Sequence, residues 1–164
     1  MAKPLALTSG EPAGIGPDIA IAAWLRRKEL DLPPFYLLGD RAFFSERAKL
    51  LGSKVEFADA TPEDTSAAFA KALPVVATGE IATARPAQPD ETSASAALAS
   101  IRHAVDHVRA GRAGAVVTNP IAKSVLYRSG FAEPGHTEFL ARLAEEARGG
   151  ASGKLHPVMM LWSS

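Results

Sequence analysis

The sequence predicts an α/β protein with a mainly parallel sheet flanked by helices. Short apolar runs alternate with segments of helical periodicity from one end of the chain to the other. The connections between them are short, which is typical of parallel strands joined by crossover helices. The run Ala115–Thr118 is apolar without a break, as expected for a strand buried on both faces of such a sheet.

Apolar runs bounded by turn residues are the expected strands. They are Leu5–Thr8, Phe35–Leu38, Val55–Phe57, Leu73–Val76, Ala115–Thr118 and Pro157–Trp162. The run at Leu73 lies within residues 58–92, which are rich in Ala, Pro, Thr and Asp and are otherwise expected to be irregular. No internal repeat is visible, and we divide residues 1–164 into no separate complete domains.

Helical periodicity marks the segments between these runs. The expected helices are Pro17–Arg27, Arg41–Leu51, Ser93–Ala110, a segment from Asn119-Pro120 to Ser129, and Glu138–Arg148. Ser93–Ala110 is the clearest, because its apolar residues fall within about 60° of Ile101 on a helical wheel. Asn119 and Thr137 are the expected N-caps of the last two helices, since their side chains can accept from free helix amides.

Composition restricts the class of protein. The 18 basic and 18 acidic side chains cancel, so nothing favours nucleic acid or an anionic membrane as a partner. Cysteine is absent, which excludes disulfides, thiolate catalysis and cysteine-bound zinc. Neither a signal peptide nor an apolar run of membrane-spanning length is visible, and we expect a soluble, cytoplasmic chain of one ordinary domain.

The glycine-rich segment Gly10–Asp18 follows a strand and opens a helix, so its backbone amides could face an anion. Its glycine spacing differs from the Rossmann fingerprint, and no Gly-Lys-Ser/Thr of a P-loop follows it. A tight strand-to-helix turn would explain the same glycines without any ligand. Glu11 could point into the cleft beside this segment or only cap its own turn, and both interpretations stay open.

His136 and Thr137 are the candidate binding residues. They follow Pro134-Gly135 at the expected start of a helix, whose positive end suits a phosphate or carboxylate. The alternative is a loop histidine beside an ordinary threonine cap. Lys123 lies in the first turn of the preceding helix, where it could meet an anionic substrate or merely lie in solvent.

The other histidines are interpreted as structural. His103 and His107 have the i, i+4 spacing that permits metal binding on a helix, but no third ligand is evident. Both fall on the polar arc opposite Ile101, which favours a solvated face. His156 precedes the last apolar run and has no identifiable partner.

Four segments resemble those of a known enzyme family. Gly10–Asp18 resembles the N-terminal signature of the 4-hydroxythreonine-4-phosphate dehydrogenase family, and its Gly-Ile-Gly-Pro core is similar to the opening turn of isocitrate and isopropylmalate dehydrogenases, whose fold that family shares. Pro134–Leu140 resembles the family's substrate-binding Gly-His-Thr-Glu segment. Val116–Lys123 and Val158–Leu161 are similar to a strand, turn and helix and to a later strand of the family, in the same order.

This resemblance implies oxidation and decarboxylation of 4-phosphooxy-L-threonine (4-hydroxythreonine 4-phosphate) in pyridoxal phosphate biosynthesis. It implies NAD or NADP as the oxidant and a divalent metal, Zn, Mg or Co, that polarises the reacting oxygen. It further implies a homodimer with a shared active site, in which His136 and Thr137 contact the substrate. It assigns no cofactor-binding residue here.

The resemblance extends only to the N-terminal half of such a two-domain enzyme. The family's metal-binding histidines fall after the point that this chain reaches, so we expect no metal ligand within residues 1–164 and no activity from this chain alone. Within the same class, a dehydrogenase of erythronate or threonate phosphate or of an aromatic cis-dihydrodiol is an alternative. From another class, a non-catalytic module that binds an anion or a partner is possible.

Overall fold

The computed structural model describes residues 2–147 and 156–162. Its parallel strands form one five-stranded sheet in the order β3-β4-β2-β1-β5. The strands are β1 (Leu5–Thr8), β2 (Phe35–Leu38), β3 (Phe57–Asp59), β4 (Leu73–Val76) and β5 (Ala115–Val117). In register, Leu5 of β1 lies opposite Phe35 of β2 on one side and Ala115 of β5 on the other. The predicted fold class is confirmed.

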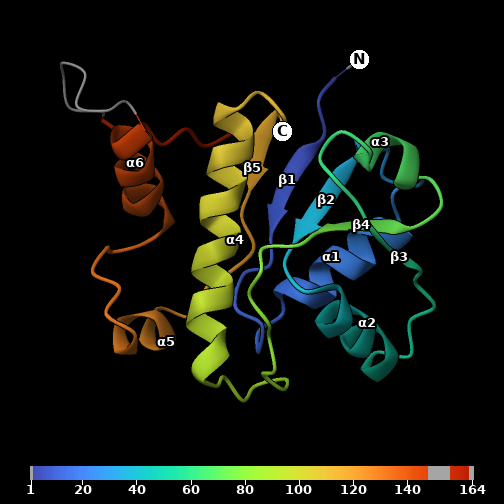
Figure 1. Cartoon of the computed structure of the whole chain (residues 1–164), viewed down its shortest axis with the longest axis horizontal. Helices are drawn as coiled ribbons and strands as arrows, with labels where there is room; N and C mark the ends of the chain where they lie inside the picture. Colours follow the sequence, from blue (N-terminus) through green and yellow to red (C-terminus); the bar gives the residue numbers. More distant parts are fainter. Residues whose placement is uncertain (1, 148–155, 163–164) are drawn as a thin grey trace.

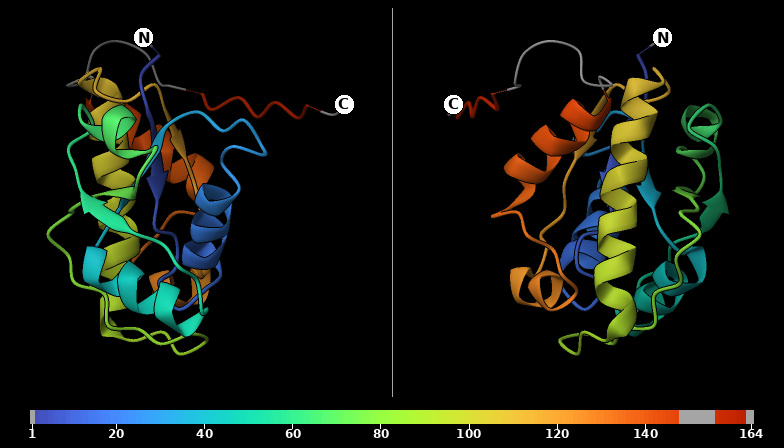
Figure 2. Two further views of the ribbon diagram at one scale, coloured as in Figure 1. Left: turned by 90° about the vertical axis from the view of Figure 1, so that its right-hand side faces the viewer. Right: turned by 60° about the vertical axis from the view of Figure 1, so that its left-hand side comes forward.

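Helices cover both faces of this sheet (Figure 1). They are α1 (Gly16–Leu25), α2 (Arg41–Leu50), α3 (Thr65–Ala68), α4 (Glu91–Arg109), α5 (Lys123–Arg128) and α6 (His136–Ala147). α1 and α2 pack on one face, the long helix α4 crosses the other, and α5 and α6 pack against α4 (Figure 2). None of the helices among the described residues is long and apolar enough to cross a membrane.

Alternation along each strand divides the core in two. Leu7 and Leu37 pack with Trp24 on the α1 face, whereas Ala6 and Tyr36 pack with the α4 face. This follows from the two-residue period of a strand, which sends neighbouring side chains to opposite faces. A further apolar cluster joins α4 to α5 and α6. It fixes the start of α6 relative to the sheet.

Several helix boundaries differ from the prediction because caps depend on which side chain is free. α4 begins at Glu91 rather than Ser93, since Asp90 forms a capping box with Ser93. α5 begins only at Lys123, because the side chain of Asn119 is engaged elsewhere. α6 already begins at His136, and the prediction of Thr137 as its N-cap is wrong. α1 ends at Leu25 rather than Arg27, and α2 ends at Leu50 rather than Leu51. The expected last residue of α6, Arg148, lies outside the described residues.

The strands differ from the prediction mainly at the edges of the sheet. β5 pairs with β1 on one side, so Ala115 and Val117 are exposed rather than buried on both faces. The strand expected at Pro157–Trp162 is wrong for this structure: its described residues pair with no strand, and Val158 is 89% exposed. β3 begins at Phe57 rather than Val55, and the short helix α3 was not predicted within the irregular stretch.

Candidate functional site

The strand order places a switch point at β1. The chain passes from β1 to β2 on one side, while β5 lies on the other side. In open α/β sheets, ligands bind beyond the carboxyl ends of the strands at such a point. The loops that follow β1 and β5 meet there, because the amide of Glu11 donates to the carbonyl of Pro120 over 2.8 Å.

The glycines after β1 are required by close packing inside the protein. Gly10 has φ +67°, and a Cβ there would lie 2.5 Å from the carbonyl oxygen of Pro120. A Cβ on Gly16 would lie 2.6 Å from the carbonyl oxygen of Ser9. These contacts support the interpretation of the segment as a tight turn, without a ligand to explain its glycines.

Glu11 caps its own turn, one of the two roles left open by the sequence. Its side chain is buried, and Oε1 accepts from the amide of Ala13 over 3.0 Å. Its carbonyl accepts from the amide of Gly14. The amides of Glu11, Ala13 and Gly14 are therefore engaged within the turn and its neighbours, and they form no anion cradle. Oε2 of Glu11 is buried and has no hydrogen-bond partner among the described residues.

His136 is the first residue of α6, and its ring is half-buried. Its Nε2 atom is shielded from solvent and has no hydrogen-bond partner in the described part of the chain. Burial lowers the pKa of His136, so the imidazole is neutral at neutral pH. A neutral ring with one free nitrogen can donate to or accept from a ligand, according to its tautomer.

The loop between α5 and α6 brings Lys123 next to Gly135, the residue that precedes this histidine. A Cβ on Gly135 would lie 3.9 Å from Nζ of Lys123 and 3.6 Å from Oε2 of Glu138, so both charges flank the residue before His136. Lys123 is exposed, and its ammonium adds to the positive end of α6. Among the residues predicted for the site, Lys123 thus lies beside Gly135, one residue before His136.

Thr137 lies on a different part of the surface of α6. It lines an open cavity of about 510 Å³ whose other wall includes residues His156–Met159. His136 is not among the described residues that line this cavity. The two side chains follow each other on a helix and so diverge by about 100°, which separates them. Contact of both residues with one substrate stays a prediction.

Asn119 and Arg47 hold the loop after β1 in place, a role that was not predicted for either residue. Asn119 donates from Nδ2 to the carbonyl of Thr8 over 2.9 Å, which ties the end of β5 to the end of β1. Arg47 of α2 is 5% exposed, pairs with Asp18 and donates from Nη2 to the carbonyl of Gly14 over 2.6 Å. A helical wheel of α2 could have indicated that Arg47 is buried, because this residue shares one side of the helix with Phe44 and Ala48.

His107 is buried rather than solvated, which corrects one of the histidine predictions. Its Nδ1 atom is hydrogen-bonded to the hydroxyl of Tyr36 over 2.9 Å, and burial lowers its pKa. Burial also raises the pKa of Tyr36 to about 12. His103 is half-buried and His156 is exposed. Across the described residues, no group of three His, Asp or Glu side chains could hold a metal ion.

A parallel sheet with loops meeting at its switch point defines the class of α/β proteins that bind small molecules at the carboxyl edge of the sheet. Residues 31–164 match the family model described as pyridoxal phosphate biosynthetic protein PdxA. The chain belongs to this family. The resemblance inferred from the glycine-rich and Gly-His-Thr-Glu segments is thereby confirmed.

Individual relatives agree with this assignment. The chain is 66% identical to a 4-hydroxythreonine-4-phosphate dehydrogenase of Bradyrhizobium diazoefficiens, over 99% of this chain and 48% of that protein. A crystal structure of a 4-hydroxythreonine-4-phosphate dehydrogenase from Klebsiella pneumoniae superimposes with a TM-score of 0.73 at 29% identity, covering 88% of this chain and 45% of that one. A terephthalate 1,2-cis-dihydrodiol dehydrogenase from Burkholderia xenovorans shares the fold, with a TM-score of 0.65 at 23% identity over 87% of this chain and 41% of that one. The chain therefore spans about half the length of the proteins it matches.

Proposed function

We propose that this chain forms the N-terminal half of a two-domain, NAD-dependent dehydrogenase of 4-phosphooxy-L-threonine in cytoplasmic pyridoxal phosphate biosynthesis. One observation carries the proposal beyond family membership. In the Gly-His-Thr-Glu segment, Nε2 of His136 has no hydrogen-bond partner among the described residues, and the ammonium of Lys123 lies beside the preceding Gly135 at the positive end of α6. A phosphorylated hydroxy acid offers both the hydroxyl and the negative charge that such a pair would bind.

His136 and Lys123 have different roles in this proposal. The neutral imidazole of His136 hydrogen-bonds the substrate, and loss of charge by burial keeps it neutral when the substrate arrives. Lys123, whose side chain is exposed, supplies positive charge to the substrate's carboxylate or phosphate. Thr137 lies on the neighbouring surface of α6 and lines an open cavity there. It contacts the substrate when the ligand bound at His136 also extends into that cavity.

The remaining parts of the proposed enzyme find no fit among the described residues. The described residues contain no three-ligand group for a divalent metal such as Zn, Mg or Co, and the amides of Glu11, Ala13 and Gly14 in the glycine-rich turn are engaged within the protein. We therefore assign no step of the reaction to a metal or to NAD through residues of this chain. Binding of the metal and nicotinamide, and a homodimer with a shared site, belong to the proposal for the whole protein.

The test is turnover and binding by the polypeptide as its gene encodes it. We expect NAD reduction with 4-phosphooxy-L-threonine, and a decrease of kcat/KM of tenfold or more, about 1.4 kcal/mol, for His136→Ala. The matched control is His103→Ala, which changes a half-buried histidine of α4 that does not line the cavity beside Thr137. Turnover of a cis-dihydrodiol or of erythronate phosphate, but not of phosphooxy-threonine, would overturn the proposed assignment of the substrate. Binding of the phosphorylated substrate without NAD reduction would instead favour a non-catalytic binding module.

A further inference from the structure

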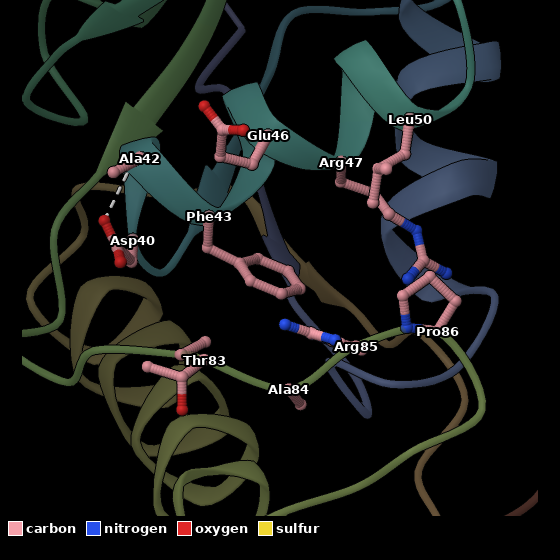
Figure 3. A pocket seen from close by; sticks show the side chains of 11 residues that line it. Asp40, Ala42, Phe43, Glu46, Arg47, Leu50, Thr83, Ala84, Arg85 and Pro86 are labelled. Carbon is pink, nitrogen blue, oxygen red and sulfur yellow. Dashed lines mark hydrogen bonds between the residues drawn. The ribbon is translucent and has the colours of Figure 1, made fainter.

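A cavity that the proposed function does not use lies between α2 and the extended segment 82–86 (Figure 3). Its volume of about 360 Å³ is within the range of sites for small organic ligands. Most of its wall is apolar, formed by Ala42, Phe43, Leu50, Ala84 and Pro86. The ring of Phe43 projects from α2 toward the segment opposite.

Two guanidinium groups line this cavity and have hydrogen-bonding capacity left. Arg47 uses Nε and Nη2 for Asp18 and Gly14, whereas its Nη1 is buried without an acceptor in the described part of the chain. Arg85 is exposed, and its guanidinium has neither an ion pair nor a hydrogen bond with any described residue. In Figure 3, Arg85 extends alongside Phe43, and Arg47 points toward Pro86.

The carboxylates around the cavity are already engaged. Asp18 neutralises Arg47, and Asp40 caps α2 by accepting from the amide of Ala42. Glu46 pairs with Lys49 over 2.6 Å, and its carboxylate points away from Arg85 (Figure 3). The free capacity at this cavity therefore consists mainly of guanidinium donors, which match oxyanions in geometry and charge.

We propose that this cavity binds a small organic oxyanion, either a phosphate ester or a carboxylate, attached to an apolar group. Its oxygens accept hydrogen bonds from Arg85 and from Nη1 of Arg47, and its apolar part lies against Phe43. Arg47 also holds the carbonyl of Gly14 in the glycine-rich turn, so a ligand here contacts the same guanidinium that supports the switch-point loop. This site is separate from His136 and does not depend on the proposed function.

The experiment is a titration of the 164-residue chain followed by two-dimensional ¹H–¹⁵N NMR. The probes are phenyl phosphate, benzoate, inorganic phosphate and benzyl alcohol. We expect phenyl phosphate or benzoate to shift the amide signals of residues 42–50 and 83–85, together with Gly14. Arg85→Gln should weaken this binding at least tenfold, and added salt should weaken it further. Arg41→Gln is the matched control, because Arg41 lies on α2 and pairs with Asp59 outside the cavity.

Each outcome bears on the proposal. Tighter binding of phenyl phosphate assigns a phosphate ester, and tighter binding of benzoate assigns a carboxylate. Signals that do not shift, or that shift elsewhere in the chain, would overturn it, as would equal binding by the Arg85→Gln and unmodified proteins. If inorganic phosphate binds as tightly as phenyl phosphate, the proposed contact of the apolar group with Phe43 is refuted. If benzyl alcohol binds as tightly as phenyl phosphate or benzoate, the proposed recognition of an oxyanion is refuted.

Discussion

Replacing Gly10 by alanine tests how tightly the loops after β1 and β5 are joined. Gly10 has φ +67°, a conformation that costs an alanine about 1–2 kcal/mol. The new Cβ would also lie 2.5 Å from the carbonyl oxygen of Pro120 and 2.8 Å from Cβ of Asn119. Neither atom can move without displacing the chain beyond β5, and overpacking of this kind costs about 1–3 kcal/mol. We expect Gly10→Ala to lower the free energy of unfolding by about 2–5 kcal/mol in total.

Gly52→Ala is the matched control. Gly52 has nearly the same backbone conformation, φ +63°, but nothing lies within 4 Å of its Cβ position. Gly52→Ala should therefore lower the free energy of unfolding by at most about 1–2 kcal/mol. In both variants, part of this loss is offset because alanine reduces the conformational entropy of the unfolded chain. Urea unfolding measures the difference, which we expect to lower the midpoint of Gly10→Ala by about 1 M relative to Gly52→Ala. Equal midpoints would refute the close contact between the two loops.

Two further changes test the buried histidine and the helix cap. Burial lowers the pKa of His107 below its ordinary value, so the unfolded chain takes up a proton at a higher pH than the folded chain. The stability that His107 contributes is complete above about pH 6.5 and is lost as the pH falls from there toward the folded pKa. His107→Gln should make the free energy of unfolding depend less on pH below about pH 6.5, and an unchanged slope would count against this assignment. Asp90→Ala should cost about 1 kcal/mol in thermal or urea unfolding, whereas Asp64→Ala, which removes no side-chain cap from α3, should cost less; equal losses would contradict the capping box.

Local patterns in the sequence were sufficient for most of the elements. Apolar runs with turn residues at their ends locate β1, β2 and β4 to the residue, and the wheel around Ile101 locates α4 to within two residues at its start. The helix starts at Lys123 and His136 were missed because Asn119 and Thr137 are good caps by type, and type does not tell which side chain is free. Asn119 is engaged by Thr8, which lies 111 residues earlier.

The sequence likewise indicated some features of the candidate site and missed others. The sequence indicated His136 and Lys123 by their place at helix starts, and it identified the family through the segments around Gly10 and His136. It could not indicate that burial leaves Nε2 of His136 without a partner, or that Thr137 lines a separate cavity. Exposure depends on what packs over a residue, and a helical wheel does not contain that information.

By itself, the sequence determined the class of fold and the positions of β1, β2 and β4, because periodicity acts over a few residues. Only the tertiary structure decided that β1 lies between β2 and β5, that Asn119 and Arg47 hold the turn from two sides, and that Lys123 lies beside Gly135. These contacts join residues far apart in the chain. They arise from burying apolar faces of the strands and helices against one another, a requirement of the whole chain that no short segment expresses.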